Sequence, residues 1–114
     1  MIGNPFTCSY SNPNKITSPS KIASSLTELW TPQLVDSTED FCIKVAKIKG
    51  ELGWHSHDDE DKIFFVLKGT LKLIMETETV ELNSGEMYVV RKGVRNNPTA
   101  DDECHIMFIE PSKS

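Results

Sequence analysis

The chain has 114 residues, of which 25% are charged and 38% hydrophobic, and its formal net charge is -5. This length fits one compact domain and is too short for two. The acidic balance argues against a phosphate backbone or an anionic membrane as partner, so we expect neither nucleic-acid nor membrane binding. The apolar runs are only strand-sized and the first residues have no leader pattern, which predicts a cytoplasmic location. Cys8, Cys42 and Cys104 are an odd number without close spacing, which favours reduced thiols.

The N-terminal part divides into an arm and a helix. Residues 1–17 are rich in Asn, Ser, Pro and Thr, which predicts a flexible arm before a single domain at 18–111 and a polar tail at 112–114. Ser18 as N-cap and Pro19 at the first helical position predict a short helix that ends before Thr31. Its apolar face consists of Ile22, Leu26, Leu29 and Trp30.

The periodicity then changes to two, which predicts β-strands. Residues 63–67 are apolar throughout, so both faces of that strand should be covered, one by the core and one by a second layer or a partner subunit. Residues 96–102 are typical of a loop. The other expected strands are 41–46, 71–75, 80–82, 87–90 and 104–109. Short strands, frequent turns and one helix predict an all-β sandwich or barrel.

His55 and His57 are the most suggestive residues for a site. Side chains at i and i+2 of an extended chain point to one face, so both imidazoles can reach one point. Two such nitrogens can hold a metal or a small ligand. An acidic loop, residues 58–61, and the apolar strand follow directly, which places the histidines beside a core. His105, in the last expected strand, is more typical of a packed residue than of a ligand.

Two segments resemble the motifs of the cupin superfamily. Residues 50–69, with His-x-His and the apolar strand, resemble the first cupin motif, and residues 85–96 resemble the second. The resemblance extends from about residue 22 to 111 and is closest to small single-domain cupins of the Cupin 2 type. It implies a double-stranded β-helix, the cupin jelly-roll barrel, with one short N-terminal helix.

The ligand set implied by the resemblance is only half present. Similar cupins hold a divalent metal with two histidines and a glutamate from the first motif and a histidine from the second. His55 and His57 match the two histidines, whereas the glutamate position is Lys62 and the last histidine position is Asn96. The proline usual in the second motif is Arg91. An ammonium has no lone pair, and an amide oxygen is a weak ligand for a transition metal.

Lys62 decides between the remaining interpretations. It shares the strand parity of Phe64, so its amine should enter the cavity that would hold the cation. We therefore expect Lys62, Phe64 and Asn96 to line a pocket, with His55, His57 and more weakly Asn96 as metal candidates. Glu60 or Asp61 as a substitute carboxylate, or a neutral Lys62, would rescue the metal site.

Three functional hypotheses remain open, and whether the chain is an enzyme is undecided. The first is a cupin with an impaired metal site that binds a small, anionic or sugar-like molecule in the barrel. The second is a metal-dependent isomerase, lyase or dioxygenase with Fe, Mn, Ni or Zn held by His55, His57 and substitute ligands. The third is a structural cupin that has lost activity. A homodimer is expected in all three, because a strand with two apolar faces needs a second cover.

Overall fold

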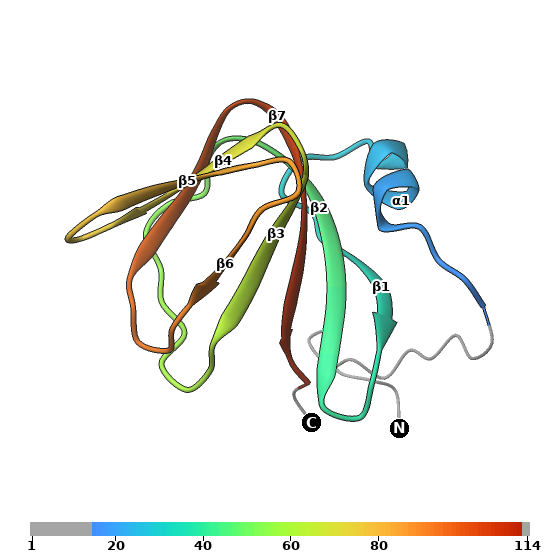
Figure 1. Ribbon diagram of the computed structural model, residues 1–114, viewed down its shortest axis with the longest axis horizontal. Coiled ribbons are helices and arrows are strands. Elements are labelled where there is room, and N and C mark those ends of the chain that lie inside the picture. The colour runs from blue at the N-terminus through green and yellow to red at the C-terminus, as the bar shows by residue number, and fades with distance from the viewer. Residues whose placement is uncertain (1–14, 113–114) are drawn as a thin grey trace.

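The computed structural model describes residues 15–112, which form one helix and seven strands (Figure 1). The predicted arm falls mostly on residues 1–14, outside the described part, and residues 15–17 have no regular structure. The elements in chain order are α1 Pro19–Ser25, β1 Gln33–Ser37, β2 Phe41–Glu51, β3 Lys62–Lys68, β4 Thr70–Met75, β5 Thr79–Asn83, β6 Met87–Val90 and β7 Asn96–Pro111.

All strand pairs are antiparallel, and β7 is the strand that connects them. The sheet runs in the order β1-β2-β7-β3-β6, and β4 pairs with both β5 and β7. The C-terminal part of β7 lies between β2 and β3, while its first residues pair with β4. This one strand therefore joins both halves of the curled sheet (Figure 1).

The interior of the barrel follows the alternation seen in the sequence. In β4, Leu71, Leu73 and Met75 are buried, while the residues between them are only partly covered. Buried and partly exposed side chains alternate in this way when only one face of a sheet packs against the core. The main core cluster contains Ala46, Ile48, Phe64, Val66, Leu71, Leu73, Leu82, Val90, Ala100, Cys104, Ile106 and Phe108.

The helix begins where the sequence predicts and ends earlier. Ser18 caps it by accepting from the Lys21 amide, but the backbone at Leu26 is already extended. Trp30 has a left-handed φ of 58°, and its amide and indole N–H groups donate to the carbonyls of Lys47 and Lys49. Its predicted place in the helix is therefore wrong, because these bonds tie it to the edge of β2.

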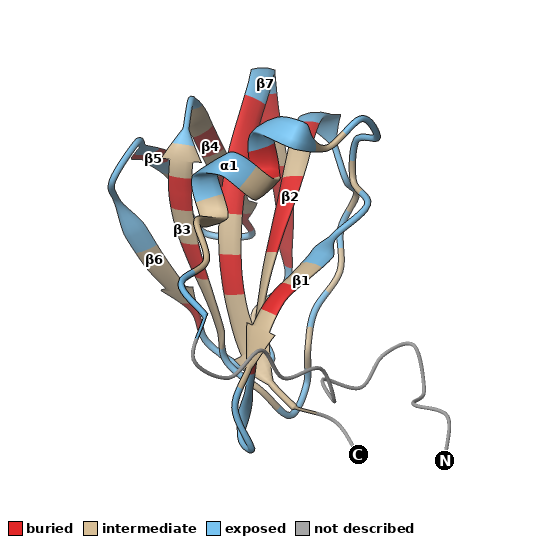
Figure 2. Ribbon diagram, turned by 90° about the vertical axis from the view of Figure 1, so that its right-hand side faces the viewer, coloured by how far each residue is buried: buried red, intermediate tan, exposed pale blue. Residues whose placement is uncertain are grey.

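The outer face of the sheet is covered in part by α1. Ala23 on the helix packs with Val35 of β1 and Val45 of β2, and Leu67 of β3 joins this smaller cluster. Figure 2 shows α1 lying across the face formed by β3, β7 and β2. The rest of this outer face has no cover among residues 15–112. On β3, Phe64 and Val66 face the core and are buried, whereas Ile63 faces the outer side and is only half-buried.

The expected loop at residues 96–102 is instead the beginning of β7. Asn96 pairs with Met75 and Thr99 with Lys72, so these polar residues complete the ladder of β4. Their sequence resembles a loop because the local signals, Asn-Asn-Pro and Asp-Asp, carry no information about a partner strand. β1 was likewise not predicted, although it pairs with β2 over most of its length.

The two described cysteines differ. Cys104 is a free thiol, and burial raises its pKa to about 11, so it stays protonated inside the core. Cys42 is disulfide-bonded, so the expectation of reduced thiols is wrong at this position. Among residues 15–112, no helix is long and apolar enough to cross a membrane.

Candidate functional site

The structure brings the two histidines of the His-x-His motif together. Their ring centroids are 5.5 Å apart and nearly perpendicular, at 87°. His55 lies in an isolated antiparallel bridge to Asn96, whose amide donates to the His55 carbonyl at 2.9 Å, and the His55 amide donates back at 3.0 Å. Directly opposed residues share a face of the sheet, so Asn96 and His55 face the same interior.

Asn96 offers an unused acceptor to this interior. Only 2% of the residue is exposed, and its side-chain Nδ2 donates to the Val94 carbonyl at 3.3 Å. Its Oδ1 has no hydrogen-bond donor among the residues described. A buried carbonyl without a donor is costly, and such groups commonly mark a place where a ligand or water binds.

Lys62 enters the core from the start of β3. Its Nζ lies 4.3 Å from the ring centroid of Phe108 and 5.2 Å from that of Phe64. Burial, and secondarily the charge of Lys44, lower the pKa of Lys62, while Glu110 and Glu60 oppose this shift. The ammonium lies over the rings of both phenylalanines, and 15% of the Lys62 side chain is exposed.

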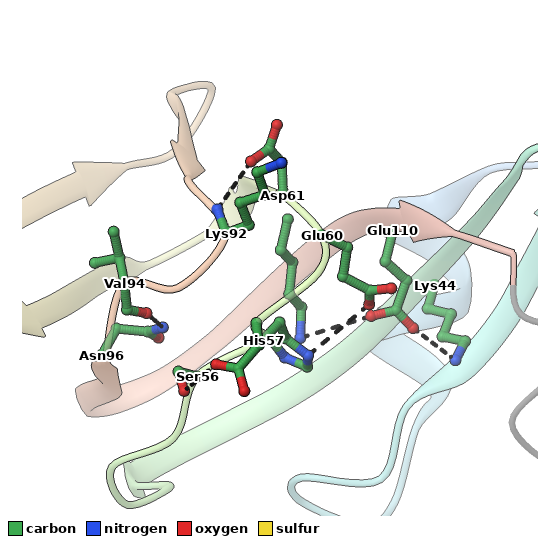
Figure 3. Close-up of polar contacts among 11 residues, drawn as sticks. Lys44, Ser56, His57, Glu60, Asp61, Lys92, Val94, Asn96 and Glu110 are labelled. Carbon is green, nitrogen blue, oxygen red and sulfur yellow. Dashed lines mark hydrogen bonds and ion pairs between the residues drawn. The ribbon is translucent and has the colours of Figure 1, made fainter.

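Glu110 holds two lysines and was not expected as a site residue. Its Oε2 accepts from Lys44 Nζ at 2.9 Å, and its Oε1 is 3.9 Å from Lys62 Nζ (Figure 3). Within residues 15–112 the Lys62 ammonium makes this longer ion pair but no direct hydrogen bond. The parity of Phe108 in the last strand could have revealed Glu110, because i and i+2 share one face.

The acidic loop divides into an inner and an outer carboxylate. Glu60 Oε1 lies 3.8 Å from His57 Nδ1, and its side chain is largely covered. Asp61 instead accepts from the Lys92 backbone amide at 2.9 Å and is exposed (Figure 3). Burial, then the charges of Lys62 and His55, lower the pKa of His57, against the opposing effect of Glu60. Of the two substitute ligands considered, only Glu60 approaches a histidine.

Comparison with known proteins fixes the family. The Cupin 2 profile, a cupin domain, matches residues 43–110. This chain belongs to the Cupin 2 family. A cupin-2 domain protein from Shewanella frigidimarina shares 38% identity, with a TM-score of 0.81 over 84% of this chain and 94% of that one. Protein NMB1881 from Neisseria meningitidis shares 26% identity, with a TM-score of 0.79 over 86% of this chain and all of that one.

A curated relative of this cupin is the uncharacterised protein YdbB of Bacillus subtilis. It is 32% identical over 73 residues, which are 63% of this chain and 65% of YdbB, slightly less than two thirds of its length. The all-β cupin fold is thereby confirmed by both sequence and structure.

The four positions implied by the family motifs are neighbours in succession: Asn96 pairs with His55, the His55 and His57 rings are in contact, and the Lys62 charge acts on His57. We call Lys62, His55, His57 and Asn96 the barrel site. No group of three or more His, Cys, Asp or Glu side chains in residues 15–112 is arranged to hold a metal ion. His105 lies elsewhere: it is 3% exposed, and its Nε2 is 3.0 Å from Glu103 Oε2, so it packs in the sheet outside the barrel site.

Proposed function

We propose that this cupin binds a small, anionic or sugar-like molecule in its barrel, with Lys62 as the main contact. The observation that carries the proposal is a largely buried ammonium whose N–H donors have no hydrogen-bond acceptor among the described residues. A carboxylate, phosphate or sugar oxygen would supply that acceptor with a charge-assisted hydrogen bond. The aromatic rings of Phe64 and Phe108 exclude water around the contact and strengthen it.

The other members of the barrel site suit hydroxyl groups. Asn96 Oδ1 is a buried acceptor without a donor. His55 Nδ1 lies 3.2 Å from the Gly53 carbonyl, to which it donates, so in the neutral ring Nε2 is left as a second acceptor. A polyhydroxylated acid would use both kinds of group at once. Glu110 weakens the binding of an anion at Lys62, because its carboxylate already lies near the ammonium and competes with the ligand.

The barrel site does not fit a divalent metal ion. The position that would supply a carboxylate carries an ammonium, and the position that would supply the last imidazole carries an amide. Repulsion between a +1 and a +2 charge about 4 Å apart is about 8 kcal/mol at an effective dielectric of 20. One amide oxygen returns much less than this.

Calorimetry and thermal unfolding test this proposal directly. D-Glucuronate, phosphate and acetate should raise the melting temperature of the parent chain, and Lys62→Met should abolish the effect. Lys72→Met is the matched control, because Lys72 pairs with Asp101 on the surface of β4. Anions that leave the melting temperature unchanged, while divalent ions raise it, would overturn the proposal.

A second candidate is a metal-dependent cupin enzyme, an isomerase, lyase or dioxygenase. The observation in its favour is that Glu60 Oε1 lies 3.8 Å from His57 Nδ1. Because no three such side chains in residues 15–112 are arranged to hold a metal, Glu60 would have to turn toward both histidines to complete the ligand set. Elemental analysis of protein purified without chelator or nickel resin decides between the two. About one Fe, Mn, Ni or Zn per chain supports the enzyme, and a content far below one excludes it.

We also infer a homodimer through the open outer face of the sheet. Phe41 and Met87 are 46% and 56% exposed, and Ile63 and Val89 lie half-buried beside them in the region that α1 does not cover. Exposed apolar area of this kind commonly marks an interface. Sedimentation showing a monomer at micromolar concentration would contradict the dimer. A dimer that binds neither anions nor metals would instead support a structural cupin.

A further inference from the structure

The barrel wall is open on one side, between β6 and the β4–β5 hairpin. Among the described strands, β6 pairs only with β3, and β5 pairs only with β4. A cavity of about 350 Å³ lies between them. We call it the side hollow; its lining includes Met75, Tyr88, Val90, Val94, Arg91 and Arg95. Figure 1 shows the hairpin extending away from β3 and β6.

The strand register connects the side hollow to the barrel site. Val90 lies directly opposite Lys62, and Tyr88 lies opposite Phe64, in the β3–β6 ladder. Met75 lies opposite Asn96 in the β4–β7 ladder. Directly opposed residues have Cβ atoms about 5 Å apart on the same face. Each of the three residues expected to line the pocket, Lys62, Phe64 and Asn96, therefore has its cross-strand neighbour in the wall of the side hollow.

The floor of the side hollow is apolar. Val90 and Met75 are buried, and Tyr88 and Val94 pack against the main core. The Asn96 Nδ2 donates a hydrogen bond to the Val94 carbonyl, which holds this side chain next to the floor. The Oδ1 of the same side chain accepts no hydrogen bond among the described residues. A flat apolar group of a ligand would gain contact with this floor, whose four side chains carry no charge.

The rim carries one uncommitted cation. Arg95 is engaged, because its NH1 is 3.7 Å from Glu76 Oε2 and its guanidinium lies 5.3 Å from the Trp54 ring centroid. Arg91 is exposed and has no ion pair within residues 15–112. Glu78 also lines the side hollow, so the rim has both signs of charge. Charge at the rim therefore does not select the ligand, which leaves the apolar floor and Lys62, the cross-strand neighbour of Val90, as the features that select it.

We propose that the side hollow is the entrance and apolar subsite of the barrel site. The ligand class is an organic acid with an aromatic or branched apolar body. Its carboxylate contacts Lys62, and its body lies on Met75, Tyr88 and Val90. This inference rests on the proposed function, because it assumes that Lys62 receives the anionic group.

Phenylacetate and acetate are the probes, since they share a carboxylate and differ in the apolar body. The parent chain should bind phenylacetate at least about tenfold more tightly than acetate, as even one methylene in an apolar pocket is worth about that factor. Thr77→Trp, at an exposed turn residue that lines the side hollow, should remove this advantage and leave acetate affinity unchanged. Thr79→Trp, two residues along and also exposed, is the matched control.

Methyl NMR locates the bound probe independently of affinity. Phenylacetate should shift the ε-methyl signal of Met75 in the side hollow and leave that of Met107, in the cluster under α1, unchanged. Binding that depends on Lys62 but leaves Met75 and the Thr77→Trp variant unaffected overturns the side hollow and leaves the proposed function standing. A chain that binds neither acid overturns both.

Discussion

Replacing Lys62 by methionine separates ligand binding from folding. Lys62 Nζ is 3.9 Å from Glu110 Oε1, an attraction of about 4 kcal/mol at an effective dielectric of 20. The contact with the Phe108 ring adds about 1 kcal/mol, while burying an ammonium costs several kcal/mol. These contributions nearly cancel, and Lys44 still pairs with Glu110 at 2.9 Å in the variant. We therefore expect the free energy of unfolding at pH 7 to change by no more than about 1 kcal/mol.

The pH dependence of this variant has a defined sign. Burial lowers the pKa of Lys62 in the folded chain below its ordinary value of 10.5. Below the folded-state pKa both states are protonated, and the penalty for burying the charge is constant. Between the folded-state pKa and 10.5 the unfolded chain binds more protons, so the stability of the parent rises with pH relative to the methionine variant.

Urea unfolding of both proteins from pH 7 to about pH 10.5 measures this difference, because titrations common to the two chains cancel. Lys72→Met serves as the control for removal of an exposed charge. The reasoning is refuted if the free energy of unfolding of Lys62→Met at pH 7 is more than about 3 kcal/mol below that of the parent. A loss of that size is typical of breaking a buried ion pair that stabilises the fold. It is equally refuted if the stability difference does not rise with pH.

Three further measurements test the assignment of the site and the fold. Lys62→Glu combined with Asn96→His should create divalent binding detectable by calorimetry with Zn²⁺; a double variant no better than the parent would mean that these positions do not converge. Gly69→Ala should destabilise the fold by about 1–3 kcal/mol more than Gly85→Ala in urea unfolding. Both glycines have φ near +90°, but only at Gly69 does an added Cβ meet a backbone oxygen of β7, at 3.0 Å. The pKa of His57, followed by NMR, should rise toward 6.5 in Lys62→Met, because burial and then the Lys62 charge lower it; an unchanged value would place the ammonium elsewhere.

The fold was predictable where a short stretch of sequence shows which face of a strand is buried and where the strand ends. The alternation of β4 and the turn glycines predict an all-β sandwich or barrel, and the resemblance of two segments to the cupin motifs implies the cupin fold, which is confirmed. The start of α1 was predictable from Ser18 and Pro19, but its end was not. Trp30 leaves the helical face because its two N–H groups find carbonyls on β2, which are distant in sequence.

Candidate site residues could be named only where strand parity and motif position are visible in the chain, and their role stays a prediction. His55, His57, Lys62 and Asn96 could be named in advance for that reason. Glu110 could not be linked to Lys62, because the ion pair joins the first residue of β3 to a residue 48 positions later. The open acceptor on Asn96 likewise depends on the His55 bridge and the Val94 carbonyl.

The sequence by itself determined which side chains are available and to which face each strand directs them, since both follow from residue type and the two-residue period of a strand. Only the tertiary structure decided which strands lie side by side. Pairing of β7 with β2, β3 and β4 turned an apparent loop into a wall of the barrel, placed Glu110 beside Lys62, and left the gap beside β6. Such contacts join residues far apart in sequence, and no local pattern encodes them.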